Sequence, residues 1–116
     1  MTDIQKLTRK IKEFNEKREW GQFHNPKDLS ISLSIEASEV LEHFQWKTLE
    51  EIKEYAKNKK EELGEELADV AIYLFQLAAK LSINLGEAIE DKIAKNDKKY
   101  PISKSKGSAK KYTEYE

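Results

Sequence analysis

Helix-breaking residues are scarce in this sequence, which contains two prolines and four glycines in 116 residues. Because proline and glycine interrupt helices, each long stretch between them can form one continuous helix. No stretch shows the alternation of apolar and polar residues that is typical of a half-buried strand. The sequence therefore predicts an all-α fold.

Start and stop signals divide the chain into helices. Asn25 is followed by a proline, and Thr48 and Asn84 each stand three residues before a glutamate, as helix-capping residues do. Thr2 gives a weaker signal, and Pro101 ends the last helix because the residue before a proline disfavours helical geometry. We expect helices near residues 2–18, 27–45, 48–57, 60–82 and 85–99.

Size and composition place these helices in one small domain. Charged residues make up 37% of the chain and apolar residues 38%, and the apolar residues recur with helical spacing, which is typical of amphipathic helices rather than disorder. A helical chain this short has difficulty burying enough apolar surface alone. We expect an antiparallel bundle of four to five helices over residues 1–102, completed by oligomerisation, and a flexible basic tail over residues 103–116.

Composition also narrows the functional classes. The absence of cysteine excludes disulfides, thiol chemistry and a cysteine-based zinc site. Neither a signal peptide nor an apolar run of roughly 18 residues is visible, so we expect a cytoplasmic protein without membrane contact. Eight lysines against one aspartate between residues 92 and 111 favour a polyanionic ligand or a solubilising tail. The net charge of -1 and the lack of a reading motif argue against stable nucleic-acid binding.

An acidic pair lies where the second expected helix should bury apolar residues. Glu36 falls on the row that contains Leu29, Leu33 and Val40, and Glu39 lies beside that row. Ionised carboxylates among apolar side chains cost several kcal/mol unless a cation or hydrogen-bond donors compensate. This pair therefore needs a partner, which is either a metal ion or a lysine or arginine from another helix.

The fourth expected helix carries a second acidic pair. Residues 70–79 are apolar on nearly every side, a pattern typical of a central helix or a subunit interface. The narrow polar strip of this helix holds Glu66 and Asp69, whose Cβ atoms lie about 5 to 6 Å apart on successive turns. Tyr73 follows on the same strip.

If the two pairs face each other, Glu36, Glu39, Glu66 and Asp69 converge. Four carboxylates this close cannot all stay ionised without cations, and a ligand set of oxygens alone selects Mg²⁺, with Mn²⁺ as a possible substitute. Bound Mg²⁺ is usually shared with substrate phosphates. A di-iron bundle would need Glu-x-x-His, which His43 does not supply. We expect His43 to be simply a half-exposed helical histidine.

Aromatic and basic residues lie near these acids in the sequence. Trp20 precedes the second helix, Trp46 ends it, and Tyr73 lies one turn after the second acidic pair. Such rings can stack a nucleobase, which contributes about 1 to 3 kcal/mol per base, although tryptophans in small cores are ordinarily packing residues. Lys92 and Asn96 on the last helix complete the outline of a site for a metal ion, phosphates and a base.

Long segments of the chain resemble the MazG-like group of all-α nucleotide pyrophosphohydrolases, especially its dCTP pyrophosphatase branch. The resembling segments are FNEKREWGQFHNPKDL (14–29), IEASEVLEHFQWK (35–47), EELADVAIYLFQL (65–77), KIAKNDKKYP (92–101) and KKYTE (110–114). The resemblance implies hydrolysis of a nucleoside triphosphate to the monophosphate and pyrophosphate. It also implies that Glu36, Glu39, Glu66 and Asp69 bind Mg²⁺, with catalytic roles for Glu36 and for Glu39 as the base that orients water.

The resemblance further implies a substrate pocket and an assembly. Trp20, Trp46 and Tyr73 match positions that line the base and sugar pocket, and Lys92 and Asn96 match substrate-contacting positions that can come from another subunit. Proteins of this group form dimers that pair into homotetramers. We therefore expect a homo-oligomer whose only other partner is a nucleotide.

Two departures from the dCTP pyrophosphatase branch bear on the choice of substrate. The connection between Trp46 and Glu61 is shorter, and Ile11 replaces a histidine that lies near the substrate. The expected substrate is dCTP or a related or non-canonical pyrimidine nucleotide, removed from the nucleotide pool in a house-cleaning role. The alternatives are a broad-specificity or dUTP-directed hydrolase, and a non-enzymatic helical module that uses its acids for ion pairing.

Overall fold

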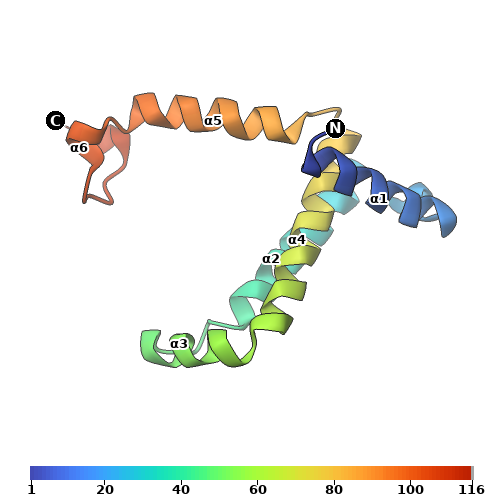
Figure 1. Ribbon diagram of the computed structural model, residues 1–116, viewed down its shortest axis with the longest axis horizontal. Helices are drawn as coiled ribbons and strands as arrows, with labels where there is room; N and C mark the ends of the chain where they lie inside the picture. The colour runs from blue at the N-terminus through green and yellow to red at the C-terminus, as the bar shows by residue number, and fades with distance from the viewer. Residues whose placement is uncertain (116) are drawn as a thin grey trace. The chain divides into compact units, whose positions relative to one another are not determined.

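The computed structural model describes residues 1–115, and its regular elements in this part of the chain are all helical (Figure 1). The elements are α1 (Asp3–Lys17), the 3-10 helix η1 (Trp20–Phe23), α2 (Pro26–Glu42), α3 (Leu49–Asn58), α4 (Lys60–Lys80), α5 (Leu85–Lys99), α6 (Ile102–Ser105) and the 3-10 helix η2 (Tyr112–Glu114). The prediction of an all-α fold is confirmed. No helix in the described part is long and apolar enough to cross a bilayer.

The chain divides into two compact units, Met1–Ile83 and Asn84–Glu116. Within the first unit, α2 and α4 lie side by side and run in opposite directions, and they form the most extensive helix contact (Figure 1). The shorter helices α1 and α3 both contact α4. The helix that the sequence marked as apolar on nearly every side is thus the central helix of its unit.

Capping residues begin the helices where the sequence predicts them. The side chains of Thr2, Asn25, Thr48 and Asn84 each accept a hydrogen bond from a backbone N–H three residues further on. Each bond satisfies one of the N–H groups that a helix start leaves without a partner. The predicted starts of α1, α2, α3 and α5 are therefore confirmed.

The end of α4 is closed by a left-handed residue that is not glycine. Ser82 has a φ of 55°. Its backbone N–H donates to the oxygen of Ala79 at 3.1 Å, and the N–H of Ile83 donates to the oxygen of Ala78 at 2.9 Å. This pair of bonds is the Schellman motif, which satisfies carbonyl groups that would otherwise be free at the helix end.

The apolar core is thin. Among the described residues, Leu29 on α2 and Ala78 on α4 are the two that are fully buried, with exposed fractions of 1% and 8%. Large apolar side chains along α2 and α4 remain exposed, and they are Ile31, Ile35, Leu41, Leu67, Ile72 and Leu74. Exposed apolar area on this scale needs a cover, because monomeric proteins rarely present large contiguous apolar patches.

The second unit is organised around a tyrosine. The ring of Tyr100, which follows α5, lies edge-on to the rings of Tyr112 and Tyr115, with 6.0 Å between ring centroids in each pair. The hydroxyl of Ser105 on α6 donates to the backbone oxygen of Tyr100 at 3.0 Å. The predicted tail, residues 103–116, therefore has local structure. Its boundary and its flexibility stay predictions. Residue 116 lies outside the described residues.

Candidate functional site

Three carboxylates meet at the contact between α2 and α4. Glu36 and Glu39 lie on successive turns of α2, and Glu66 lies on α4. Each of the three side chains offers a carboxylate oxygen, and these oxygens all lie within 4.8 Å of one another. All three residues are half-buried. The antiparallel helix pair therefore assembles most of the acidic cluster that helical phase predicted.

In the described part of the chain, lysine and arginine side chains do not compensate the charge of the acidic cluster. Among the described residues, no lysine or arginine forms an ion pair with the three glutamates, which leaves the alternative of Lys or Arg pairing without support. The Oε2 atoms of Glu36 and Glu66 are buried and accept no hydrogen bond within that part of the chain. Buried oxygens without donors are costly, so the cluster fits an oxygen-binding divalent cation.

The pKa values of two glutamates in the cluster are raised. Burial, and after it the neighbouring carboxylates of Glu39, Asp69 and Glu66, together raise the pKa of Glu36 from its usual 4.5 to about 7. Burial and Glu39 also raise the pKa of Glu66, against an opposing effect of His43. The carboxylates of Glu36 and Glu66 are therefore harder to ionise than in water unless a cation is present.

Asp69 lies at the edge of this cluster. It is not in the group of oxygens that lie within 4.8 Å of one another. Its charge nevertheless acts on Glu36, and both residues line one pocket of about 440 Å³. Asp69, the fourth predicted metal ligand, therefore lies near the three glutamates but outside their group. Its role as a ligand stays a prediction.

His43, expected as a half-exposed helical histidine, is half-buried at the C-terminal cap of α2 and lies beside the acidic cluster. Its side chain is 16% exposed, and its Nε2 atom lies 3.7 Å from Oε1 of Glu66. Its Nδ1 atom shares a hydrogen bond with the hydroxyl of Tyr55 on α3. His43 follows Glu39 by four residues, and this spacing on one helix face was the signal that could have placed it.

The pocket of about 440 Å³ joins the acids to aromatic side chains. Trp20 from η1 and Tyr73 from α4 line it together with Glu36 and Asp69. The ring of Phe14 on α1 also lines the pocket and lies edge-on to Trp20, with 5.7 Å between centroids. Two of the three predicted base-stacking residues therefore border the same space as the acidic cluster.

The other predicted substrate-contacting residues lie elsewhere in the chain. Trp46 is 86% exposed and does not line this pocket. Lys92 is exposed and Asn96 is half-buried on α5, which belongs to the second unit. Contacts of these three residues with a substrate stay predictions.

Fold and site together define an all-α protein whose central antiparallel helix pair carries a cluster of carboxylates beside an aromatic pocket. The sequence pattern of the MazG-like family matches residues 31–115. The chain belongs to the MazG-like family.

Relatives with known names agree with this assignment. The chain is 41% identical to dCTP pyrophosphatase 1 of Bos taurus over 113 residues, which cover 96% of this chain and 67% of that protein. It is 38% identical to dCTP pyrophosphatase 1 of Homo sapiens over 113 residues, covering 96% and 66%. The chain thus spans about two thirds of the length of these mammalian relatives.

A solved structure shares the fold. The crystal structure of a pyrophosphatase from Archaeoglobus fulgidus superposes with a TM-score of 0.81 and 41% sequence identity. The match covers 87% of this chain and 94% of the archaeal chain.

Proposed function

We propose that this protein is a nucleoside triphosphate pyrophosphohydrolase that converts dCTP, or a related or non-canonical pyrimidine deoxynucleotide, to the monophosphate and pyrophosphate. The observation that carries the proposal is the cluster of Glu36, Glu39 and Glu66, in which Glu36 and Glu66 each have a buried oxygen without a donor and Glu36 also lines an aromatic pocket. Relatives named dCTP pyrophosphatase 1 support the choice of substrate. The cellular role is removal of unwanted nucleotides from the cytoplasmic pool.

The acidic side chains hold the metal in this proposal. Glu36, Glu39, Glu66 and Asp69 are the ligands for Mg²⁺, for which Mn²⁺ can substitute. Bound in this place, the ion neutralises the charge of the phosphates and makes water a stronger nucleophile. Glu39 accepts the proton of the attacking water as general base, and Glu36 keeps its carboxylate in position.

The remaining predicted residues bind the substrate. Trp20 and Tyr73 border the pocket and stack on the base and sugar. Trp46, Lys92 and Asn96 complete the site from another subunit of a homo-oligomer, a dimer or a pair of dimers. The exposed apolar side chains of α2 and α4 support such an assembly, because a second copy would cover them.

A panel of substrates tests the proposal. The purified protein is incubated with each dNTP and NTP, with Mg²⁺ or with EDTA, and the products are separated by chromatography. We expect a deoxynucleoside monophosphate from dCTP when Mg²⁺ is present and none in EDTA. Turnover of all triphosphates at one rate would favour the broad-specificity alternative. No turnover of any triphosphate would favour the alternative of a non-enzymatic helical module.

A further inference from the structure

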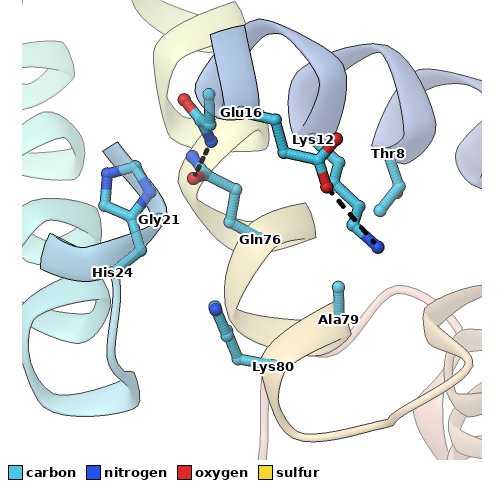
Figure 2. Close-up of a pocket in the computed structure, with 9 residues that line it drawn as sticks. Thr8, Lys12, Glu16, Gly21, His24, Gln76, Ala79 and Lys80 are labelled. Atoms are coloured by element: carbon cyan, nitrogen blue, oxygen red, sulfur yellow. Dashed lines mark hydrogen bonds and ion pairs between the residues drawn. The ribbon is translucent and has the colours of Figure 1, made fainter. Parts of the chain in front are cut away.

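Two amide side chains form a hydrogen bond across the inner wall of the aromatic pocket. The Nδ2 atom of Asn15 on α1 donates to Oε1 of Gln76 on α4 at 2.8 Å, and Figure 2 shows this bond as the dashed line at Gln76. Both residues are half-buried. Both line the pocket that holds Trp20 and Tyr73, and they also line a smaller adjoining pocket of about 260 Å³.

The bonds of the two amides fix their orientation. Nε2 of Gln76 donates to the backbone oxygen of Ile72 at 3.3 Å, and a carbonyl oxygen can only accept. Gln76 therefore turns its Oε1 toward Asn15, and Asn15 must turn its Nδ2 toward Gln76. Oδ1 of Asn15, which can only accept, is left without a hydrogen-bond partner among the described residues.

The position of this pair along α4 matches the extended shape of a nucleotide. Glu66, Asp69, Tyr73 and Gln76 follow one another on the helix, so the pair lies two turns, or about 10 Å, beyond Asp69. If the acids hold the phosphates and Tyr73 lies beside the base or sugar, the amide pair lies at the far edge of the base.

We propose that Asn15 and Gln76 are specificity-determining residues that select a base carrying an exocyclic amino group, and among pyrimidines cytosine over uracil or thymine. This inference rests on the proposed function, because it needs a nucleotide in the pocket. The Oδ1 atom of Asn15 accepts a hydrogen bond from the amino group, and Gln76 prevents the Asn15 amide from rotating. A keto oxygen at the same place would face Oδ1 with no proton between two acceptors.

Cytosine and uracil nucleotides differ in this group, so they make a matched pair for the test. The ratio of kcat/KM for dCTP to kcat/KM for dUTP is measured for the wild-type protein and for Asn15→Leu and Gln76→Met. Affinities for the α,β-imido analogues of dCTP and dUTP are measured by calorimetry with Mg²⁺ present. Thr8→Val is the control, because Thr8 lies on α1 and lines the adjoining pocket but not the aromatic one.

The two variants should fail in different ways. Asn15→Leu removes the acceptor, so kcat/KM for dCTP falls about tenfold while that for dUTP rises or stays the same, because the keto oxygen no longer faces an acceptor. Gln76→Met keeps the acceptor but frees the Asn15 amide to rotate, so kcat/KM for dUTP rises toward that for dCTP. Thr8→Val should keep the wild-type ratio. An unchanged ratio in Asn15→Leu, or equal wild-type affinity for the two analogues, would overturn the inference.

Two further outcomes separate this inference from the hydrolysis it rests on. If Asn15→Leu does not fold, Gln76→Met is the test of the inference. An unchanged ratio of kcat/KM for dCTP to kcat/KM for dUTP in Gln76→Met then overturns the role of the pair. If the wild-type protein hydrolyses no triphosphate, the proposed function fails. The analogue affinities then judge the amide pair separately, and equal binding or no binding of the two analogues refutes it.

Discussion

The Nε2 atom of His43, the C-terminal cap residue of α2, lies 3.7 Å from the Oε1 atom of Glu66 on α4. The other ring nitrogen of His43 shares a hydrogen bond with Tyr55 on α3, and the backbone oxygen of His43 accepts from Nζ of Lys47 at 2.5 Å. The imidazole is thus bonded to Tyr55, outside the acidic cluster, while it faces one member of that cluster. We therefore expect His43 to restrict the orientation of the Glu66 carboxylate.

Replacing His43 should weaken metal binding. We expect His43→Leu to raise the Mg²⁺ concentration for half-maximal activity about tenfold, because residues that orient metal ligands typically contribute at least that much. The Mg²⁺ dependence of activity and Mn²⁺ binding followed by electron paramagnetic resonance measure the effect. Ser38→Ala, on an exposed position of α2, is the control. Equal Mn²⁺ affinity in His43→Leu and wild type would argue against this role.

Stability of the metal-free protein should fall as the pH rises through neutrality. The pKa of Glu36 is about 7 in the folded state, and its ordinary value, which applies to the unfolded chain, is 4.5. Between these values the folded chain holds a proton that the unfolded chain has lost, so raising the pH in this window favours unfolding. The melting temperature in EDTA should therefore decrease from pH 5 to pH 8.

Two comparisons assign this pH dependence to the acidic cluster. Mg²⁺ binds the ionised carboxylates and should offset the loss of stability at high pH. Glu36→Gln, which has no ionisable group at this position, should show a weaker decrease in EDTA. A melting temperature that is constant or rises over this range in EDTA would contradict the raised pKa.

Glu39 should be needed for the chemical step. Glu39→Gln is expected to lower kcat about 100-fold or more at saturating Mg²⁺, because a general base typically contributes at least that factor. Glu42→Gln is a matched change at an exposed position of the same helix and should retain the wild-type rate. Full activity of Glu39→Gln would assign the base to another residue.

Trp20 and Tyr73 should act mainly on substrate binding. Trp20→Ala and Tyr73→Leu are expected to raise KM about tenfold with a smaller change in kcat, since stacking stabilises the bound substrate and the transition state alike. Phe23→Leu is the control, because Phe23 is exposed on η1 and does not line the pocket. A loss confined to kcat in steady-state kinetics would exclude a base-stacking role.

The end of α4 offers a test of the fold that is independent of catalysis. Ser82→Gly should raise the free energy of unfolding by about 1 kcal/mol, because glycine adopts the left-handed conformation of this position without steric cost. Ser38→Gly, inside α2, should lower it by a similar amount. Urea denaturation at one fixed protein concentration measures both, and a loss of stability in Ser82→Gly would contradict the description of this helix end.

Local chemistry was enough to predict the helices and the acidic cluster. Helix starts depend on a capping side chain and its neighbours, so Asn25 and Thr48 could be recognised within four residues of sequence. Helical phase likewise placed Glu36 on an apolar row and Glu66 on the narrow polar strip of the central helix without knowledge of the packing. Both features follow from residues that are close together in the chain.

Contacts between distant helices could not be predicted in this way. The hydrogen bond between Asn15 and Gln76 joins residues 61 positions apart, and each is an ordinary polar residue within its own helix. The contact of His43 with Tyr55 depends on the turn that brings α3 back toward α2. Trp46 resembled a pocket residue by its place in the sequence, but its exposure is set by packing.

Phosphorus NMR of dCTP turnover tests directly whether the protein releases pyrophosphate, because it identifies the bond that is cleaved. With Mg²⁺ and the wild-type protein, we expect the triphosphate signals to disappear and dCMP and pyrophosphate to form in equal amounts. Glu66→Gln should show the same products at a much lower rate, and EDTA should stop the reaction. Formation of dCDP and orthophosphate, or turnover that is unchanged in EDTA, would contradict the account.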